Sequence, residues 1–153
     1  MFGRIVWATD GSAGADAALA AAKALAEPRG RIVAVHCTEL LTGRAMGMLA
    51  NPEDPVIVGR VRAQVEQLAA EGFDADLVTW RSHLSPAEIV AEVADQEHAD
   101  LIVCGTRGHG VVTGALMGSV SQRLPHAAHV PVLIVPPPAK SATDPPRPAE
   151  AHA

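Results

Sequence analysis

The chain has 153 residues, of which 48% are hydrophobic, and a formal net charge of −5. This length and this apolar content suit one domain with a real hydrophobic core. The negative charge, with only two Phe, two Trp and no Tyr, disfavours a nucleic-acid partner bound through basic grooves and aromatic stacking.

The first part of the chain reads as strand, helix and strand. Residues 4–9 (RIVWAT) have the apolar character of a buried strand, and Asp10-Gly11-Ser12 ends it. Alanines at helical spacing then predict a first helix that continues to about residue 26, where the following Pro-Arg-Gly turn (28–30) stops it. Residues 31–37 (RIVAVHC) predict the second strand.

A long connection leads to the next pair of elements. Residues 39–54 carry Gly, Asn and Pro without a sustained period, which predicts an irregular loop of a kind that is often functional. A second helix is expected from Pro55 to just before Gly72, and residues 76–80 (DLVTW) predict the third strand. Ser85-Pro86-Ala87-Glu88 has the form of a capping box, so a third helix begins there.

The last elements complete an alternating pattern. Residues 100–104 (DLIVC) predict a fourth strand, followed by the glycine-rich stretch 105–110, a short helix from about Ser119 and a fifth strand at 132–135 (VLIV). Strands that alternate with helices predict an α/β fold. We expect an open, doubly wound, five-stranded parallel sheet with helices on both faces, similar to a Rossmann fold.

Two features near the end of the chain modify this scheme. Pro125 falls inside the last helix, and an interior proline costs roughly 3 kcal/mol, so we expect that helix to break at Leu124. Residues 138–153 are rich in Pro and Ala, which predicts a disordered tail outside a domain that spans residues 1–137.

The glycine-rich stretch is the most informative motif. Gly105-Thr-Arg-Gly108-His109-Gly110 follows a buried strand, and Gly118-Ser119 opens a helix, with Ser119 expected as its N-cap and Gln122 as the capping partner. Glycines let main-chain N–H groups approach an anion, and a helix N-terminus adds about half a unit of positive charge. The stretch therefore predicts a phosphate site.

Two common nucleotide motifs do not fit. No Lys-Ser or Lys-Thr follows Gly110, so the site is not a P-loop and fast phosphoryl transfer is not expected. The turn after the first strand has Gly11 and Gly14 but no GxGxxG pattern, which excludes the usual dinucleotide fingerprint.

The spacing Gly105, two residues, Gly108, nine residues, Gly118-Ser119 resembles the ATP-binding signature of the universal stress protein family. The resemblance extends from Ile5–Ser12 to Pro131–Val135. It implies a parallel sheet in the order 3-2-1-4-5 and a homodimer paired through the strand at 131–135. The apolar run 130–135 agrees with that pairing, since an edge strand of this kind would otherwise invite uncontrolled association.

The resemblance also implies which residues contact the ligand. Ala8, Thr9 and Asp10 lie at the end of the first strand, where Asp10 would face ribose or a hydrated metal. Val35 and His36 would border the adenine, and Arg107 and His109 could reach a phosphate tail. The positions matched to phosphate and ribose contacts are Gly105, Gly108, Gly118, Ser119, Val120 and Ser121.

The expected ligand is ATP, with Mg²⁺ held mainly by phosphate oxygens because Asp10 is the only carboxylate obvious at the strand ends. Asp10 has another interpretation, as part of an ordinary helix cap through its neighbour Ser12. The favoured function is an ATP-binding regulatory or stress-response protein. The alternatives are a slow ATP hydrolase or nucleotidyl-transfer enzyme, or a sensor of AMP or cAMP.

The location of the protein follows from weaker signals. Cys37 and Cys104 each end an apolar run without CxxC spacing, which is typical of buried thiols in a reducing compartment. No secretory leader pattern opens the chain, and no apolar run approaches the roughly 20 residues that span a bilayer. We therefore expect a cytoplasmic protein with no membrane contact.

Overall fold

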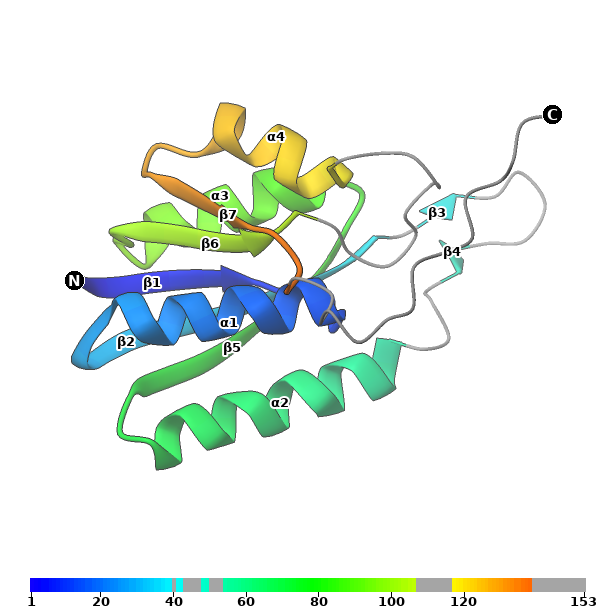
Figure 1. Ribbon diagram of the computed structural model, residues 1–153. Helices are drawn as coiled ribbons and strands as arrows, with labels where there is room; N and C mark the ends of the chain where they lie inside the picture. The colour runs from blue at the N-terminus through cyan, green and yellow to red at the C-terminus, as the bar shows by residue number, and fades with distance from the viewer. Residues whose placement is uncertain (40, 43–47, 50–53, 107–116, 139–153) are drawn as a thin grey trace, which may run out of the picture.

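The chain folds into an open sheet with helices on both faces, as the computed structural model in Figure 1 shows. The structure describes residues 1–39, 41–42, 48–49, 54–106 and 117–138. The strands of the main sheet are β1 (Phe2–Ala8), β2 (Ala26–Glu39), β5 (Asp74–Ser82), β6 (Leu101–Gly105) and β7 (Val132–Val135). The helices are α1 (Ala13–Leu25), α2 (Asp54–Ala70), α3 (Pro86–Gln96) and α4 (Ser119–Ala127).

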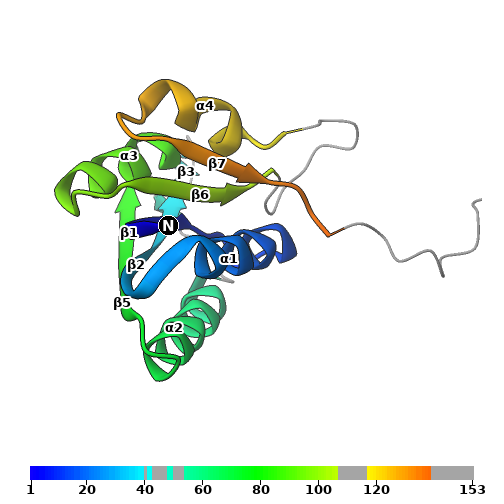
Figure 2. The ribbon, with the colours of Figure 1, turned by 60° about the vertical axis from the view of Figure 1, so that its left-hand side comes forward.

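The five strands are parallel and lie in the order β5-β2-β1-β6-β7. Counted along the chain, this is the order 3-2-1-4-5, so the predicted doubly wound fold is confirmed. β1 is the central strand: its Val6 pairs with Val33 of β2 on one side and with Ile102 of β6 on the other. Figure 2 shows β7 beside β6, at the opposite end of the sheet from β5.

Alternate residues of each strand serve two layers of helices. Ile5 and Trp7 of β1 pack in the cluster with α1 and α2, whereas Val6 and Ala8 pack in the cluster with α3 and α4. Figure 1 shows these two pairs of helices on opposite sides of the sheet. Trp7 is fully buried, and its indole N–H donates to the carbonyl of Ala15 in α1 at 2.9 Å. This bond satisfies the polar atom of a large core side chain.

β2 is longer than predicted at both ends. It begins at Ala26 rather than at residue 31 because the chain returns to the sheet directly after α1, where Ala26 pairs with Phe2. The early part of the strand is irregular: the register shifts, and Arg29 has a φ of 61°. At its other end β2 continues to Glu39.

The segment 39–54 is not wholly irregular. It contains a two-residue strand β3 (Leu41–Thr42) that pairs antiparallel with β4 (Met48–Leu49) in a separate sheet. The prediction of a loop is therefore wrong for these residues. The positions between and after the two short strands, up to residue 53, lie outside the described part of the chain.

The prediction that the last helix breaks at Leu124 is also wrong. α4 continues to Ala127 with Pro125 inside it. Proline has no N–H to donate to the carbonyl four residues earlier, but helical bonding resumes at Ala128, whose N–H donates to the Leu124 carbonyl at 2.9 Å. Leu124 is completely buried, so the packing of this side chain offsets the lost bond.

Arg31 ties three elements together at the amino ends of the strands. From β2, its Nε donates to Glu97 at the end of α3 at 2.8 Å, and its Nη1 donates to the Asp74 carboxylate of β5 at 3.1 Å. The bond from Arg31 holds the pKa of Glu97 below its ordinary value, against the opposing effect of burial. The same bond raises the pKa of Arg31, so this guanidinium stays charged.

We predict that Glu97→Gln lowers the free energy of unfolding by about 1 kcal/mol near neutral pH, because it removes the charge that Arg31 binds. The pKa of Glu97 is lower in the folded chain than in the unfolded chain. Its stabilisation is therefore present above the unfolded value, about 4.3, and is lost as the pH falls through the folded value. Urea unfolding at about pH 7 and about pH 3 should show a difference from wild type that shrinks in acid.

Glu66→Gln is the matched control, since Glu66 is exposed on α2. It should leave the unfolding free energy within about 0.5 kcal/mol of wild type. An equal loss in the control, or a loss in Glu97→Gln that does not change with pH, would contradict the assignment.

Candidate functional site

The carboxyl ends of β1 and β6 form a switch point in the sheet. From β1 the chain crosses through α1 to β2, and from β6 it crosses through α4 to β7 on the other side. α1 and α4 lie on opposite faces (Figure 1). Diverging connections of this kind leave room between neighbouring strand ends, which is where open α/β sheets bind ligands.

The turn between β1 and α1, residues 9–12, is held by its own side chains. Asp10 Oδ1 accepts from the Ser12 N–H at 3.0 Å, and Thr9 Oγ1 accepts from the Gly11 N–H at 3.1 Å. Gly11 has a φ of 76°, a conformation that residues with a Cβ rarely adopt. Ser12 is the N-cap of α1, and its hydroxyl accepts from the Ala15 N–H at 3.3 Å. Asp10 therefore helps to shape the turn that precedes the cap.

The end of β6 lies directly against the first turn of α1. A Cβ added to Gly105 would lie 2.7 Å from both the carbonyl carbon and the carbonyl oxygen of Gly14. Side-chain atoms do not approach main chain this closely, so only glycine allows the two segments to touch. The glycine at position 105 is required by the packing of the chain itself, whatever the site binds.

The N-cap of α4 is Gly118, so the prediction that Ser119 caps this helix is wrong. The Gly118 carbonyl accepts the first helical bond from the Gln122 N–H at 3.1 Å, and the Gly118 N–H donates to the Thr106 carbonyl at 2.7 Å. The contact with Thr106 turns the chain into the helix one residue earlier than expected. The Gln122 side chain donates to the Met117 carbonyl instead of closing a capping box.

Ser121 ties the start of α4 to the main chain around it. The side chain is buried, and its Oγ lies 2.9 Å from the carbonyl oxygens of both Thr106 and Gly118. Thr106 in turn donates its N–H to the Val135 carbonyl of β7 at 3.0 Å. The N–H groups of Ser119 and Val120 belong to the first turn, where an α-helix supplies no carbonyl acceptor of its own.

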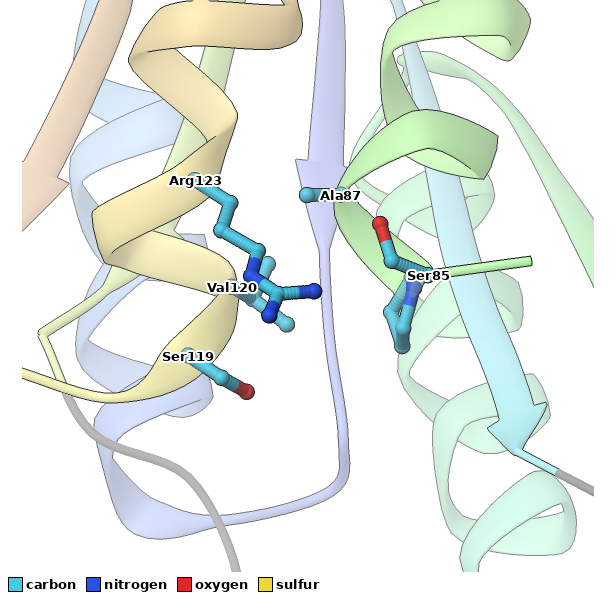
Figure 3. A pocket seen from close by; sticks show the side chains of 6 residues that line it. Ser85, Ala87, Ser119, Val120 and Arg123 are labelled. Atoms are coloured by element: carbon cyan, nitrogen blue, oxygen red, sulfur yellow. The ribbon is translucent and has the colours of Figure 1, made fainter. Parts of the chain in front are cut away.

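A cavity of about 150 Å³ opens between the first turns of α3 and α4 (Figure 3). Its lining residues are Ser85, Pro86, Ala87, Ser119, Val120 and Arg123. The predicted capping box of Ser85 and Glu88 is confirmed at the start of α3. Figure 3 shows the Arg123 side chain extending from α4 into the space between the two helices. The N-terminus of α4 and the Arg123 guanidinium make this cavity favourable for an anion, whereas the N-terminus of α3 already carries the Glu88 carboxylate of its capping box.

A buried polar pair links the carboxyl end of β2 to the start of α2. His36 and Asp54 are each 4% exposed, and His36 Nε2 lies 2.8 Å from Asp54 Oδ1. The other ring nitrogen, Nδ1, lies 3.0 Å from the Thr9 carbonyl oxygen. Thr38 Oγ1 donates to the same Asp54 Oδ1 at 2.6 Å. Burial opposes the ionisation of Asp54, but the bonds from Thr38 and His36 outweigh it and lower the pKa of this carboxyl.

The residues predicted to contact the ligand lie in different environments in the structure. The side chains of Ala8 and Val35 are buried in the core beneath α3 and α4, and the Val35 carbonyl accepts from the Thr9 N–H at 3.0 Å. The switch point brings together the β1–α1 turn, the end of β6 and the first turn of α4. Arg107, Gly108 and His109 lie outside the described residues.

Sequence reasoning missed several participants. Arg123 lies four residues after Ser119, on the same face of a helix, and this spacing is the signal that could have identified it. The sequence identified Pro86 and Ala87 only as the start of a helix. Nothing in the sequence indicated that Asp54 and His36 would meet.

The described residues give little support for a membrane span, a metal site or a reactive thiol. Within the described ranges, every helix is too short or too polar to cross a membrane. In the same part of the chain, His, Cys, Asp and Glu side chains do not gather in the threes that hold a metal ion. Burial raises the pKa of both Cys37 and Cys104 to about 11, which keeps these thiols protonated and unreactive.

Comparison with known sequences agrees with this fold. The model of the Universal stress protein family matches residues 1–136. A universal stress protein of Thermus aquaticus is 38% identical over 144 residues, which cover 88% of this chain and 99% of the relative.

Solved structures show the same architecture. A universal stress protein crystallised in complex with cAMP superposes with a TM-score of 0.62 at 23% identity, over 88% of this chain and 97% of the other. A universal stress protein from Archaeoglobus fulgidus in complex with dAMP superposes with a TM-score of 0.54 at 22% identity, over 86% and 96%. At these identities the likeness shows the fold.

We predict that Gly105→Ala lowers the free energy of unfolding by about 2 kcal/mol, because the added methyl group would overlap the Gly14 main chain. Thermal unfolding followed by circular dichroism measures the loss. Gly59→Ala in α2 is the control, since an added Cβ there meets nothing within 4 Å. That variant should be neutral or up to about 1 kcal/mol more stable. Wild-type stability in Gly105→Ala would show that β6 and α1 do not touch in this way.

Proposed function

Because this chain belongs to the universal stress protein family, we propose that it is a stress-response protein that acts by binding an adenine nucleotide. The proposed site extends from the β1–α1 turn, at the carboxyl end of β1, to the cavity between the first turns of α3 and α4. The observation that carries the proposal is the cavity where the first turns of α3 and α4 meet Arg123. The complexes of proteins of the same fold with cAMP and dAMP support adenine as the base.

The chemistry of the cavity suits a phosphate. The N–H groups of Ser119 and Val120 lie in the first turn of α4, where the helix dipole favours negative charge. Arg123 can form two parallel hydrogen bonds to phosphate oxygens, a geometry that lysine lacks. A volume of about 150 Å³ accommodates one group of a nucleotide, so the remainder of the ligand would lie outside this cavity.

We propose ATP as the physiological nucleotide, with AMP and cAMP as the alternatives. The spacing of Gly105, Gly108 and Gly118, which resembles an ATP-binding signature, supports a ligand with several phosphates. The Gly118 N–H is already bonded to the Thr106 carbonyl, so the main-chain donors that α4 would offer are those of Ser119 and Val120. Mg²⁺ would rest mainly on the phosphate oxygens, because Asp10 is the carboxylate that the β1–α1 turn offers to this edge of the sheet.

We predict that Arg123→Gln weakens nucleotide binding about tenfold, because it removes a charge-assisted bond to phosphate. Isothermal titration with ATP, AMP and cAMP measures the dissociation constants of the wild type and the variant. Arg62→Gln is the matched control, since Arg62 is an exposed arginine of α2 on the other face of the sheet.

The three titrations also rank the ligands. A decrease in affinity from ATP to AMP would support a site that contacts several phosphates. No heat with any of the three nucleotides at millimolar concentration would refute the proposed function. Equal losses in Arg123→Gln and Arg62→Gln would show that charge alone, and not the cavity, attracts the ligand.

We also propose that two copies of the chain associate through residues 131–135. β7 is an edge strand with a single neighbour, β6, in the main sheet. Its four residues are all apolar and only partly buried. An exposed apolar edge of this kind presents main-chain groups that a second strand can pair with.

We expect the protein to sediment as a dimer at micromolar concentration, because pairing would cover the edge of β7. Analytical ultracentrifugation over a range of concentrations is the measurement. A mass of 15.8 kDa at every concentration would contradict the proposed dimer.

A further inference from the structure

The His36–Asp54 pair is the most deeply buried pair of titratable side chains at the carboxyl edge of the described sheet. It joins three elements that are distant in the sequence: β2 through His36, α2 through Asp54, and the end of β1 through the Thr9 carbonyl. Arg81 of β5 adds a fourth element, with its Nη2 3.6 Å from Asp54 Oδ2. A buried polar network of this extent is costly unless every member is satisfied, so its geometry is strongly constrained.

The hydrogen-bond pattern fixes the orientation of the His36 ring. The Thr9 carbonyl oxygen can only accept a hydrogen bond, and the ionised Asp54 carboxylate can likewise only accept. Both ring nitrogens of His36 face such acceptors, at 3.0 and 2.8 Å. Both nitrogens of the ring are therefore occupied by contacts within the protein, and the ring cannot turn without losing one of them.

The pair acts on the turn that borders the proposed site. Thr9 is held on both sides by β2, since its N–H donates to the Val35 carbonyl at 3.0 Å and its C=O accepts from His36. Its hydroxyl accepts from the Gly11 N–H, and the neighbouring Asp10 accepts from Ser12. The position of Thr9 therefore determines the rest of the turn.

α2 makes a second contact with the same turn. Arg60, one and a half turns beyond Asp54, donates to the Gly11 carbonyl and forms an ion pair with Asp16 of α1. Gln64, one turn further, donates to the other oxygen of Asp16 at 2.8 Å. α2 thus contacts the turn at two points. Asp54 reaches Thr9 through His36, and Arg60 binds the Gly11 carbonyl directly.

We propose that the buried His36–Asp54 pair is the positioning element of the nucleotide site, holding the β1–α1 turn against α2 and coupling nucleotide affinity to the attachment of that helix. The inference rests on the proposed function. His36 and Asp54 act through Thr9 and not by touching the ligand. Because coupling between two sites is reciprocal, a bound nucleotide must in turn strengthen the attachment of α2.

The test compares variants that break the bonds with one that keeps them. His36→Phe keeps an aromatic ring, slightly larger than imidazole, but removes both hydrogen bonds, and Asp54→Ala removes the partner of Nε2. Each should weaken binding of ATP or AMP about tenfold, within the usual range of coupling between sites. Asp54→Asn should recover affinity to within about threefold of wild type, because an amide N–H can donate to Nε2 of a neutral ring while Nδ1 still donates to Thr9.

Glu97→Gln is the matched control, since it disturbs a polar network at the opposite edge of the same sheet. It should lower stability without changing affinity. Circular dichroism and tryptophan fluorescence, to which buried Trp7 and the more exposed Trp80 both contribute, establish that each variant is folded. Wild-type affinity in a folded His36→Phe or Asp54→Ala protein would overturn the inference, as would an equal loss in Asp54→Asn and Asp54→Ala.

Hydrogen exchange of the wild-type protein gives a readout that does not depend on any variant folding. Addition of ATP or AMP should slow exchange at the first turns of α2 as well as in residues 9–12, because nucleotide and α2 stabilise the same turn. Protection of residues 9–12 without protection of α2 would overturn the positioning role while leaving nucleotide binding intact. Absence of binding in the wild type would reject the proposed function, and the positioning role with it.

Discussion

The arrangement of the whole carboxyl edge depends on the pairing of β1 with β2 on one side and β6 on the other. This pairing leaves β1 buried on both faces. At the carboxyl ends of β1 and β6, the connection from β1 to α1 and the connection from β6 to α4 run to opposite faces of the sheet. A strand held on two sides and covered on two faces cannot shift its register without exposing core residues. The turn that follows it is consequently presented at a constant position relative to β6, and Gly105 completes that geometry by admitting the main chain of Gly14.

Polar groups have different roles at the amino ends and at the carboxyl ends of the strands. At the amino ends of the strands, Arg31 pairs with Glu97 and Asp74 in positions that water can still reach, and the effect is on stability. At the carboxyl ends, His36 and Asp54 are withdrawn from water and control the main chain of a turn. The first network stabilises by direct attraction between charges. The second is worth more as a constraint on shape, since a buried polar pair gains little net stability over an apolar one.

Much of the fold followed from patterns that act locally. Apolar runs such as residues 4–9 and 100–104, helical spacing of alanines and the capping box at Ser85 each describe a few consecutive residues, and the structure contains the corresponding elements. Their alternation implied a parallel sheet, because parallel strands need long crossovers. The failures came from contacts with parts of the chain outside these local patterns. The cap of α4 moved to Gly118 because Thr106 binds its amide, and Pro125 stayed helical because Leu124 is buried in the core.

The sequence by itself determined the alternation of elements, the order of motifs and the chemistry available to the site, since these depend on side-chain type and short spacing. Only the tertiary structure decided which of those groups meet. It brought Arg123 and Ser85 to one cavity, and it joined His36 to Asp54 and to Thr9. Such contacts depend on how the strands are ordered and how far each helix reaches across the sheet. Those quantities arise from the packing of the entire chain, and no window of neighbouring residues contains them.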